Sequence, residues 1–312
     1  MRVFVTGATG FLGRHLVPLL VERGDDVVAL VRPATAASWL EERGVRIVRG
    51  DLLGGDAVPA APGAELVFHL AGVVAHERRD LSRLVRANVE GLRLALEAAP
   101  SGARFVHVSS VAAIGPAPAP DRPATEEQPF PLHAGRYPYA ATKREGEAVA
   151  RAAADQGRDV VIACPGFLLG PDDVYGISTW PVRRYLEGTL RIHERGGLSH
   201  VDARDVAVGL VNLAERGRSG ERTILTNRDG NMSHERLYER IAAVTGVRRR
   251  TVGLPPRVAA LGSTLVPWPV KPGEVRAAAN WWFYDPAKAE RELGWSPRPL
   301  EETIRDTAGQ YL

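Results

Sequence analysis

Three glycines near the start of the chain constrain its fold more than any other feature. Gly7, Gly10 and Gly13 are spaced three apart, between an apolar run at residues 2–6 and a helical pattern at residues 12–23. In this setting the first glycine permits a tight turn, the second lets the backbone approach a pyrophosphate, and the third lets the helix pack closely on the strand. The free N–H groups and the dipole at the helix start attract the anion. The loop therefore predicts a dinucleotide site.

The first half of the chain repeats this strand–helix alternation. Its short runs of Val, Ile, Leu and Phe are nearly continuous, which is typical of a parallel sheet covered on both faces. Alternation with right-handed crossovers predicts an α/β fold with a doubly wound parallel sheet. The expected strands are residues 2–6, 26–31, 45–48, 66–70, 103–109, 160–163 and 223–226, and the expected helices are residues 12–23, 84–98, 139–156 and 201–213.

Two later segments have weaker periodicity and more Pro, Gly, Trp and Arg. We therefore expect a dinucleotide-binding domain of residues 1–165 and 200–225, and a smaller substrate-binding domain of residues 166–199 and 226–312. The proline-rich stretch at residues 115–131 is either a plain connection or a wall beside the active site. The aromatic residues of the second domain either pack its core or line an apolar substrate pocket; they are Trp180, Trp281, Trp282, Phe283 and Tyr284.

The residue that ends the second strand bears on which dinucleotide binds. An acid there would bond the 2′-hydroxyl of the adenosine ribose, but this chain has Arg32. A planar guanidinium suits a 2′-phosphate, which favours NADP over NAD, although it could also stack on the adenine of either cofactor. Asp51 is placed to accept from the adenine amino group. The other residues expected to line the cofactor are Thr9, Phe11, Leu12, Leu52, Leu70, Ala71, Gly72 and Ser109.

Tyr139 and Lys143 stand four residues apart, on one face of a predicted helix. A free tyrosine has a pKa of about 10, and a neighbouring cation favours the phenolate, so we expect Lys143 to lower the pKa of Tyr139. Tyr139 could then give a proton to an alkoxide or take one from an alcohol. Ser110, after the fifth strand, is placed to polarise a substrate carbonyl. Serines after a strand are also ordinary turn residues.

Together these motifs resemble the extended short-chain dehydrogenase/reductase family, over essentially the whole chain. The residues that carry the resemblance are 6–13, 50–52, 109–110, 139–143, 164–171 (Cys-Pro-Gly-Phe-Leu-Leu-Gly-Pro), 200–207 (His-Val-Asp-Ala-Arg-Asp-Val-Ala) and 285–299. The resemblance implies a Rossmann-type sheet and a catalytic triad of Ser110, Tyr139 and Lys143, with Lys143 also bonding the nicotinamide ribose. It further implies nicotinamide contacts from Pro165, Gly166, Phe167 and Leu168, and a homodimer formed by the helices at residues 84–98 and 139–156.

The chain departs from the family's nucleotide-sugar enzymes in two segments. Their Arg-Pro-x-Asn motif is replaced by residues 164–167 (Cys-Pro-Gly-Phe), and their Arg-Asp-aromatic run by residues 196–199 (Gly-Gly-Leu-Ser). Both changes remove groups that would hold a substrate diphosphate. Residues 111–113 (Val-Ala-Ala) also replace the acids that follow the serine in dehydratases. The chain thus looks more like the dihydroflavonol reductase and 3β-hydroxysteroid dehydrogenase branch, which handles neutral, apolar ketones and alcohols.

Other classes of function find little support in the sequence. The net charge of +3 and the scattered arginines, including residues 248–250, indicate a solvated surface rather than a nucleic-acid site. The single cysteine, Cys164, lies in an apolar run and is interpreted as a buried small residue. His69 and His107 are interpreted as core residues, and His200, Asp202 and Asp205 as structural groups that orient the two domains. We expect no metal site, no membrane span and a cytoplasmic location.

The sequence thus predicts an NAD(P)-dependent oxidoreductase that reduces a ketone, or oxidises the matching alcohol, on a small, largely apolar substrate. Two alternatives remain open. The same residues could oxidise and re-reduce one bound sugar in an NAD-retaining epimerase or dehydratase. A non-catalytic, dinucleotide-sensing binding protein could also keep the fold, although the Tyr139–Lys143 pair argues against it.

Overall fold

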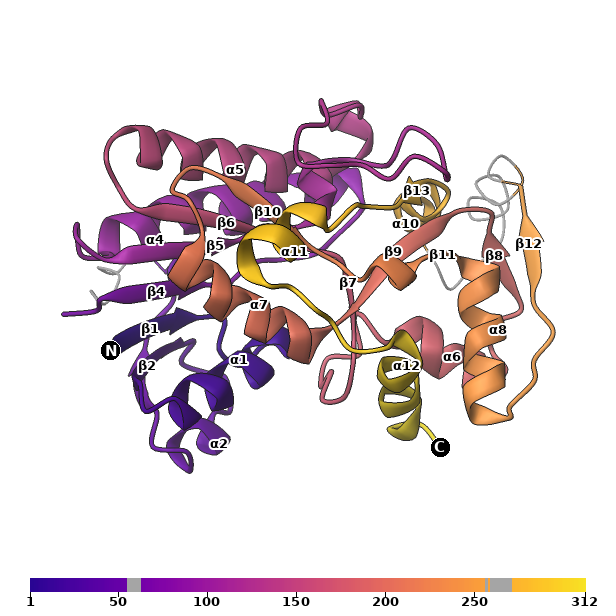
Figure 1. Ribbon diagram of the computed structural model, residues 1–312, viewed down its shortest axis with the longest axis horizontal. Coiled ribbons are helices and arrows are strands. Elements are labelled where there is room, and N and C mark those ends of the chain that lie inside the picture. Colours follow the sequence, from indigo (N-terminus) through magenta and orange to yellow (C-terminus); the bar gives the residue numbers. More distant parts are fainter. Residues whose placement is uncertain (55–62, 256–257, 259–270) are drawn as a thin grey trace.

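The computed structural model describes residues 1–54, 63–255, 258 and 271–312. Within these residues, seven parallel strands form one sheet in the order β3-β2-β1-β4-β5-β6-β10 (Figure 1). The strands are β1 (Arg2–Thr6), β2 (Asp26–Val31), β3 (Arg46–Arg49), β4 (Leu66–His69), β5 (Arg104–Val108), β6 (Val160–Pro165) and β10 (Arg222–Leu225). The predicted doubly wound α/β sheet is confirmed.

Helices cover both faces of this sheet. They are α1 (Phe11–Glu22) and α7 (Ala203–Arg216) on one face, and α4 (Gly91–Ala98) and α5 (Pro138–Asp155) on the other (Figure 1). Leu16 of α1 and Leu210 of α7 share an apolar cluster with strand residues. Leu92 of α4 and Ala150 of α5 belong to the cluster on the opposite face. Apart from the edge strand β3, whose residues are exposed or half-buried, the strands are therefore largely shielded from water on both sides, as their near-continuous apolar sequences require.

The strand order reverses between β1 and β4, and this reversal positions the site. The chain winds from β1 toward β3 on one side, then returns to β4 and winds toward β10 on the other. At such a switch point the loops at the carboxyl ends of the two central strands diverge and leave room for a ligand. The glycine loop follows β1, and residues 70–77 follow β4.

The remaining sheets lie mainly at the other end of the molecule, to the right in Figure 1. β9 (Gly197–Asp202) pairs with β7 (Phe167–Leu169), β11 (Asn231–Ser233) and β13 (Trp281–Trp282), and β8 (Ile192–Glu194) pairs with β12 (Val252–Leu254). A third apolar cluster lies among α6 (Trp180–Leu186), α8 (His234–Thr245) and α12 (Leu300–Gly309). The shorter elements are α2 (Ser38–Glu41), η1 (Arg78–Asp80), α3 (Leu81–Val85), η2 (Arg86–Glu90), η3 (Val111–Ala113), η4 (Ala134–Arg136), η5 (Arg228–Gly230), α10 (Pro272–Ala278) and α11 (Ala287–Leu293).

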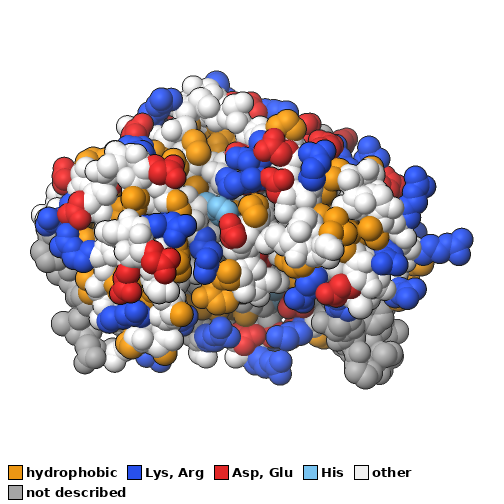
Figure 2. Space-filling model, turned by 90° about the horizontal axis from the view of Figure 1, so that it is seen from below, with side chains coloured by type: hydrophobic (Ala, Val, Ile, Leu, Met, Phe, Trp, Pro, Cys, Tyr) orange, Lys and Arg blue, Asp and Glu red, His pale blue; other side chains and the backbone are white. Residues whose placement is uncertain are grey.

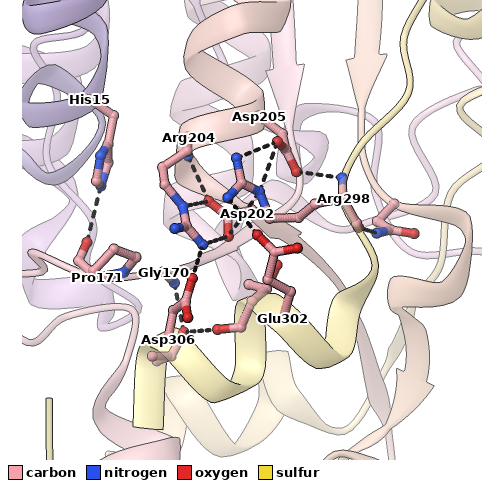
Figure 3. A network of polar contacts seen from close by, with 12 residues as sticks. His15, Gly170, Pro171, Asp202, Arg204, Asp205, Arg298, Glu302 and Asp306 are labelled. Atoms are coloured by element: carbon pink, nitrogen blue, oxygen red, sulfur yellow. Dashed lines mark hydrogen bonds and ion pairs between the residues drawn. The ribbon is translucent and has the colours of Figure 1, made fainter. Parts of the chain in front are cut away.

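A network of ion pairs fastens α12 to the first turn of α7 (Figure 3). The Asp202 carboxylate accepts from the backbone N–H of Arg204 at 2.8 Å, which caps α7, and pairs with the Arg204 guanidinium at 2.7 Å. That guanidinium also pairs with Asp306 of α12 at 2.7 Å. Beside it, Arg298 pairs with Asp205 at 3.0 Å. Asp202 and Asp205 therefore take part in structural ion pairs, and the expectation that they orient two domains stays a prediction.

Two expected helices differ from the observed ones by more than one residue at an end. The helix expected at residues 201–213 begins at Ala203, because Val201 and Asp202 belong to β9. The helix expected at residues 84–98 begins at Leu81 and contains a π-helical turn, η2, between α3 and α4. Such turns often occur at functional sites.

The division into two domains stays a prediction, and parts of both expected domains lie outside the described residues. Ala289, Leu293 and Trp295 come from the expected substrate domain, yet they pack in the apolar cluster under α7.

Candidate active site

The glycine loop forms a tight cradle against the loop after β4. Gly7 has a φ of +74°, and a Cβ there would lie 2.7 Å from the backbone nitrogen of Ala71. A Cβ at Gly13 would lie 2.3 Å from the carbonyl oxygen of Ala8, so α1 can approach β1 only without a side chain at this position. No described side chain caps the first N–H groups of α1 after Gly10. This geometry fits the pyrophosphate of a dinucleotide.

The other residues predicted to line the cofactor near its pyrophosphate lie in the same loops or beside them. Thr9, Phe11 and Leu12 belong to the glycine loop and the start of α1, and Leu70 and Gly72 belong to the loop after β4. Leu52 is buried in the loop after β3.

The adenosine end of the site carries an exposed arginine. Arg32 follows β2 directly, and no ion pair to its side chain is found among the described residues. Arg49 holds the loop that follows, because its guanidinium donates to the Thr35 carbonyl at 2.7 Å. The Asp51 carboxylate accepts the N–H of Leu53 at 3.0 Å and so closes a turn. Arg32 is therefore available to an anion, and its role stays a prediction.

Tyr139 and Ser110 meet at the carboxyl end of β5. Pro138 starts α5, and Tyr139 follows it, which places the phenol in the first helical turn. The Ser110 hydroxyl lies beside the Tyr139 phenol, where it acts to lower the pKa of Tyr139. Ser110 also accepts the N–H of Ala112 at 3.2 Å, which fixes its side chain as the cap of η3. The structure thus brings the two predicted residues together.

Lys143 lies one helical turn after Tyr139 and is buried. Its ammonium donates to the Val108 carbonyl at 3.0 Å. Burial lowers the pKa of Lys143 to about 8, while Glu147 acts in the opposite direction. A Cβ at Gly72 would lie 3.5 Å from its Nζ atom, so the loop after β4 passes directly over this lysine.

The expected effect of Lys143 on Tyr139 is wrong. Burial raises the pKa of Tyr139 above its ordinary value, and the Ser110 hydroxyl only partly opposes that rise. Desolvation penalises the phenolate more than the surroundings stabilise it, and the Lys143 ammonium is bonded to a carbonyl. At neutral pH Tyr139 is therefore a protonated phenol, which suits proton donation to a forming alkoxide.

A buried carboxylate that the sequence analysis missed lies beneath the site. Glu147 accepts from the Ser109 hydroxyl at 2.8 Å and from the Cys164 thiol at 3.2 Å. It also pairs with Arg222 at 3.2 Å and with Arg151 at 3.0 Å. The Ser109 hydroxyl is thus held inside the protein, which leaves only its backbone to line a cofactor. Cys164 is fully buried, as expected.

Asn88 is a second residue that was missed. It lies in η2 and is buried; its amide donates to the Val73 carbonyl at 3.0 Å and accepts the Val73 N–H at 2.9 Å. The same amide donates to Thr142 at 3.2 Å, so it ties the loop after β4 to α5. Glu147 offered a signal, since it follows Lys143 at helical spacing; Asn88 gave none within an ordinary helical pattern.

Tyr284 holds the turn that follows Ser110. Its hydroxyl lies 3.0 Å from the Val111 carbonyl and 2.8 Å from the Gly115 carbonyl, so it can donate to either. The N–H of Ala117 donates to Trp281 at 2.7 Å, so the proline-rich loop is anchored to the C-terminal segment. Trp282, Phe283 and Tyr284 are core residues, whereas Trp180 and Trp281 are half-buried.

The expected nicotinamide contacts lie at the end of β6 and in β7. Pro165 ends β6, and Phe167 and Leu168 pair with β9. A Cβ at Gly166 would lie 2.6 Å from the Ser199 carbonyl, so this strand passes very close to β9. The set lies beyond the carboxyl end of the sheet, where the fold places its ligand.

The buried histidines bear no sign of a metal centre. His69 and His107 stack with ring centroids 5.9 Å apart and are buried, as expected. Burial lowers the pKa of His69 to about 3, so the ring is neutral. Within the part of the chain that the structure describes, no cluster of His, Cys, Asp or Glu could hold a metal ion. No described helix is long and apolar enough to cross a membrane.

Comparison with known proteins gives a consistent result. The sequence profile described as the NAD dependent epimerase/dehydratase family matches residues 3–226. The chain is 33% identical to the "Putative dihydroflavonol 4-reductase" of Synechocystis sp., over 97% of this chain and 92% of that protein. It is 31% identical to the 4-hydroxy-2-methyl-3-oxo-4-farnesyl-3,4-dihydroquinoline-1-oxide ketoreductase of Stigmatella aurantiaca, over 99% of this chain and 96% of that one.

A solved structure covers the whole chain. It is a nucleoside-diphosphate-sugar epimerase from Pseudomonas aeruginosa, with a TM-score of 0.82 at 26% identity, over 100% of this chain and 97% of that chain.

Proposed function

The chain belongs to the NAD dependent epimerase/dehydratase family and is an NAD(P)-dependent oxidoreductase of the extended short-chain dehydrogenase/reductase type, and on that premise we propose that it reduces a ketone on a small, largely apolar substrate. The observation that carries the proposal is the juxtaposition of Ser110 and Tyr139 at the carboxyl end of β5, with Lys143 buried one turn away. The relatives named as reductases support it.

Each side chain has a defined part in the proposed reduction. The Ser110 hydroxyl donates to the substrate carbonyl and polarises it. Tyr139, protonated at neutral pH, gives its proton to the oxygen as the carbonyl becomes an alcohol. Lys143 bonds the nicotinamide ribose. A nicotinamide dinucleotide supplies the hydride when bound, and the glycine loop would hold its pyrophosphate.

The geometry of β9 favours an uncharged substrate over a sugar diphosphate. Where the nucleotide-sugar enzymes carry Arg-Asp, this chain has Gly196 and Gly197. A Cβ at Gly196 would lie 2.0 Å from the Ala278 carbonyl, and one at Gly197 would lie 2.5 Å from the Met232 carbonyl. No charged side chain can project from these positions, so two groups that would grip a diphosphate are replaced by close packing.

We propose NADP as the preferred cofactor, with NAD as the weaker one. Arg32 is exposed and unpaired among the described residues, which suits the 2′-phosphate. Arg32→Glu should weaken NADPH binding at least about tenfold and leave NADH binding less affected, because the carboxylate repels only the extra phosphate. Titration of cofactor fluorescence measures both affinities. Equal losses of affinity for NADPH and NADH would refute the proposal that Arg32 binds the 2′-phosphate.

The first test measures NADPH consumption, as loss of absorbance at 340 nm, when purified protein is incubated with NADPH and a panel of hydrophobic ketones. We expect consumption by the wild type and by Tyr175→Phe, which removes a hydroxyl from an exposed tyrosine. We expect a rate loss of about a hundredfold or more in Tyr139→Phe. Consumption that survives in Tyr139→Phe would refute the assigned proton donor.

The epimerase alternative is favoured by the described activity of the structural neighbour at 26% identity. It predicts a protein that retains NAD through purification and consumes neither cofactor with any ketone. A protein that binds NADPH reversibly without turnover would instead fit the dinucleotide-sensing alternative. The homodimer and the cytoplasmic location stay predictions.

A further inference from the structure

The loop after β4 brings a histidine against the proposed proton donor. The rings of His76 and Tyr139 meet edge to face, with centroids 5.8 Å apart and planes at 68°. His76 is half-buried, and no described residue hydrogen-bonds to its imidazole. An imidazole without a hydrogen-bond partner in the protein can bond water or a ligand through both nitrogens. Beside a catalytic tyrosine, that partner is best supplied by the substrate.

Helix α10 fixes this histidine in place. The N–H of Gly273 donates to the Glu77 carboxylate at 2.7 Å, and a Cβ at Gly273 would lie 2.2 Å from the carbonyl oxygen of His76. The first turn of α10 therefore packs directly on the backbone of this loop. Asn280, which follows α10, donates to the Tyr137 hydroxyl at 3.3 Å and joins the same wall to the start of α5. A residue held this firmly can select among substrates.

The surrounding charges indicate what the imidazole can bind. Burial lowers the pKa of His76, Glu274 and Glu77 raise it, and Lys271 lowers it; the net pKa lies below the ordinary value. The ring is therefore neutral at neutral pH and offers one donor and one acceptor nitrogen. Two carboxylates and one ammonium leave the immediate surroundings acidic, which disfavours an anionic substrate group.

We propose that His76 is a specificity-determining residue that hydrogen-bonds a neutral oxygen on the carbon next to the reacting carbonyl. The inference rests on the proposed ketone reduction and names its substrate class: α-hydroxy ketones and 1,2-diketones. A carbonyl bonded to Ser110 and Tyr139 places its neighbouring carbon beside the ring that touches Tyr139. A hydroxyl or second carbonyl there hydrogen-bonds to His76, whereas a methyl displaces water from the imidazole without replacing its hydrogen bond.

The test compares two ketones of nearly equal size, 2-hydroxyacetophenone and propiophenone, in which a methyl replaces the hydroxyl. NADPH consumption gives kcat/KM for both with wild type, His76→Phe, His76→Gln and the exposed control His133→Phe. His76→Phe keeps a ring against Tyr139 and removes both nitrogens, and His76→Gln keeps a donor and an acceptor. NADPH affinity, measured by fluorescence, checks that each variant still binds cofactor.

We expect wild type and His133→Phe to prefer the hydroxy ketone. In His76→Phe that preference should fall about tenfold, mainly through kcat/KM for the hydroxy ketone, and His76→Gln should restore part of it. Equal effects of His76→Phe on both ketones, or no effect, would overturn the role of His76. If the wild type reduces neither these ketones nor the wider panel, the proposed function itself fails. The wild-type measurement alone therefore distinguishes that failure from a failure of the role of His76.

Discussion

Glu147→Gln is the most demanding test of the energetics beneath the active site. The substitution keeps the size of the side chain and an oxygen acceptor for Ser109, but it removes the charge that faces Arg222. The Arg222 side chain is only 14% exposed, whereas Arg151 is 40% exposed. Solvent screens the pair with Arg151, so the loss falls mainly on the pair with Arg222.

Removing one partner of a buried ion pair costs about 3–5 kcal/mol, because the other charge stays buried without compensation. Arg222 also donates to the Glu126 carbonyl at 2.8 Å, which keeps part of its guanidinium satisfied. We therefore expect a loss near the lower end, about 3 kcal/mol, and a Tm lower by roughly 6–10 °C.

Urea unfolding followed by circular dichroism measures the free energy of unfolding of Glu147→Gln. The control is Glu145→Gln, which makes the same change of charge at an exposed position of the same helix. A difference between the two variants below about 0.5 kcal/mol, the range of ordinary surface substitutions, would refute the claim that Glu147 anchors this network.

Three further predictions follow from other contacts. Gly13→Ala should destabilise the protein by about 1–3 kcal/mol and weaken NADPH binding at least about tenfold, since its Cβ would lie 2.3 Å from a carbonyl oxygen. The control Gly309→Ala, whose Cβ would meet nothing within 4 Å, should do neither. Equal denaturation midpoints for the two variants would contradict this prediction. Tyr284→Phe should cost about 1–3 kcal/mol and lower kcat, because it frees the turn after Ser110; an unfolding curve and a kcat matching those of Tyr175→Phe would argue against that role. Stability should fall as the pH drops below about 6.5, by up to about 4 kcal/mol per pH unit. The reason is that three buried histidines stay neutral in the folded protein but take up protons when it unfolds, so acid favours the unfolded state. A urea midpoint that stays constant between pH 7 and pH 5 would be incompatible with their burial. Their folded pKa values are about 3 for His69, about 3 for His200 and about 4 for His234.

Much of the large sheet could be predicted because its determinants are local. The turn at Gly7 and the close packing at Gly13 are set within one strand–turn–helix unit, and each strand has an apolar run of its own. Ser110 could be placed because it follows β5 almost directly, and Tyr139 because it stands four residues before Lys143 in a helical pattern. The fold thus follows from patterns of a few residues each.

The rest depended on contacts between distant segments. The last two residues of β9, Val201 and Asp202, were assigned to the following helix, and the rest of β9 was not predicted as a strand, since its pairing with β7, β11 and β13 leaves no periodic signal in six residues. The pKa of Tyr139 was misjudged because spacing along a helix reveals a neighbouring charge but not the burial that outweighs it. His76 gave no signal, since its contact with Tyr139 depends on where α10 packs.

The ion pairs between α7 and α12 have a consequence for how the chain folds during synthesis. Ribosomes release the chain from its N-terminus at about 5–20 residues per second, so the seven strands can pair before Arg298 and Asp306 exist. Until those two residues emerge, Arg204 lacks its partner on α12, and Asp205 lacks its partner in the segment just before α12. A nascent chain halted before residue 298 would present the exposed first turn of α7 to chaperones. Completion of the last helix is then the step that ends its dependence on them.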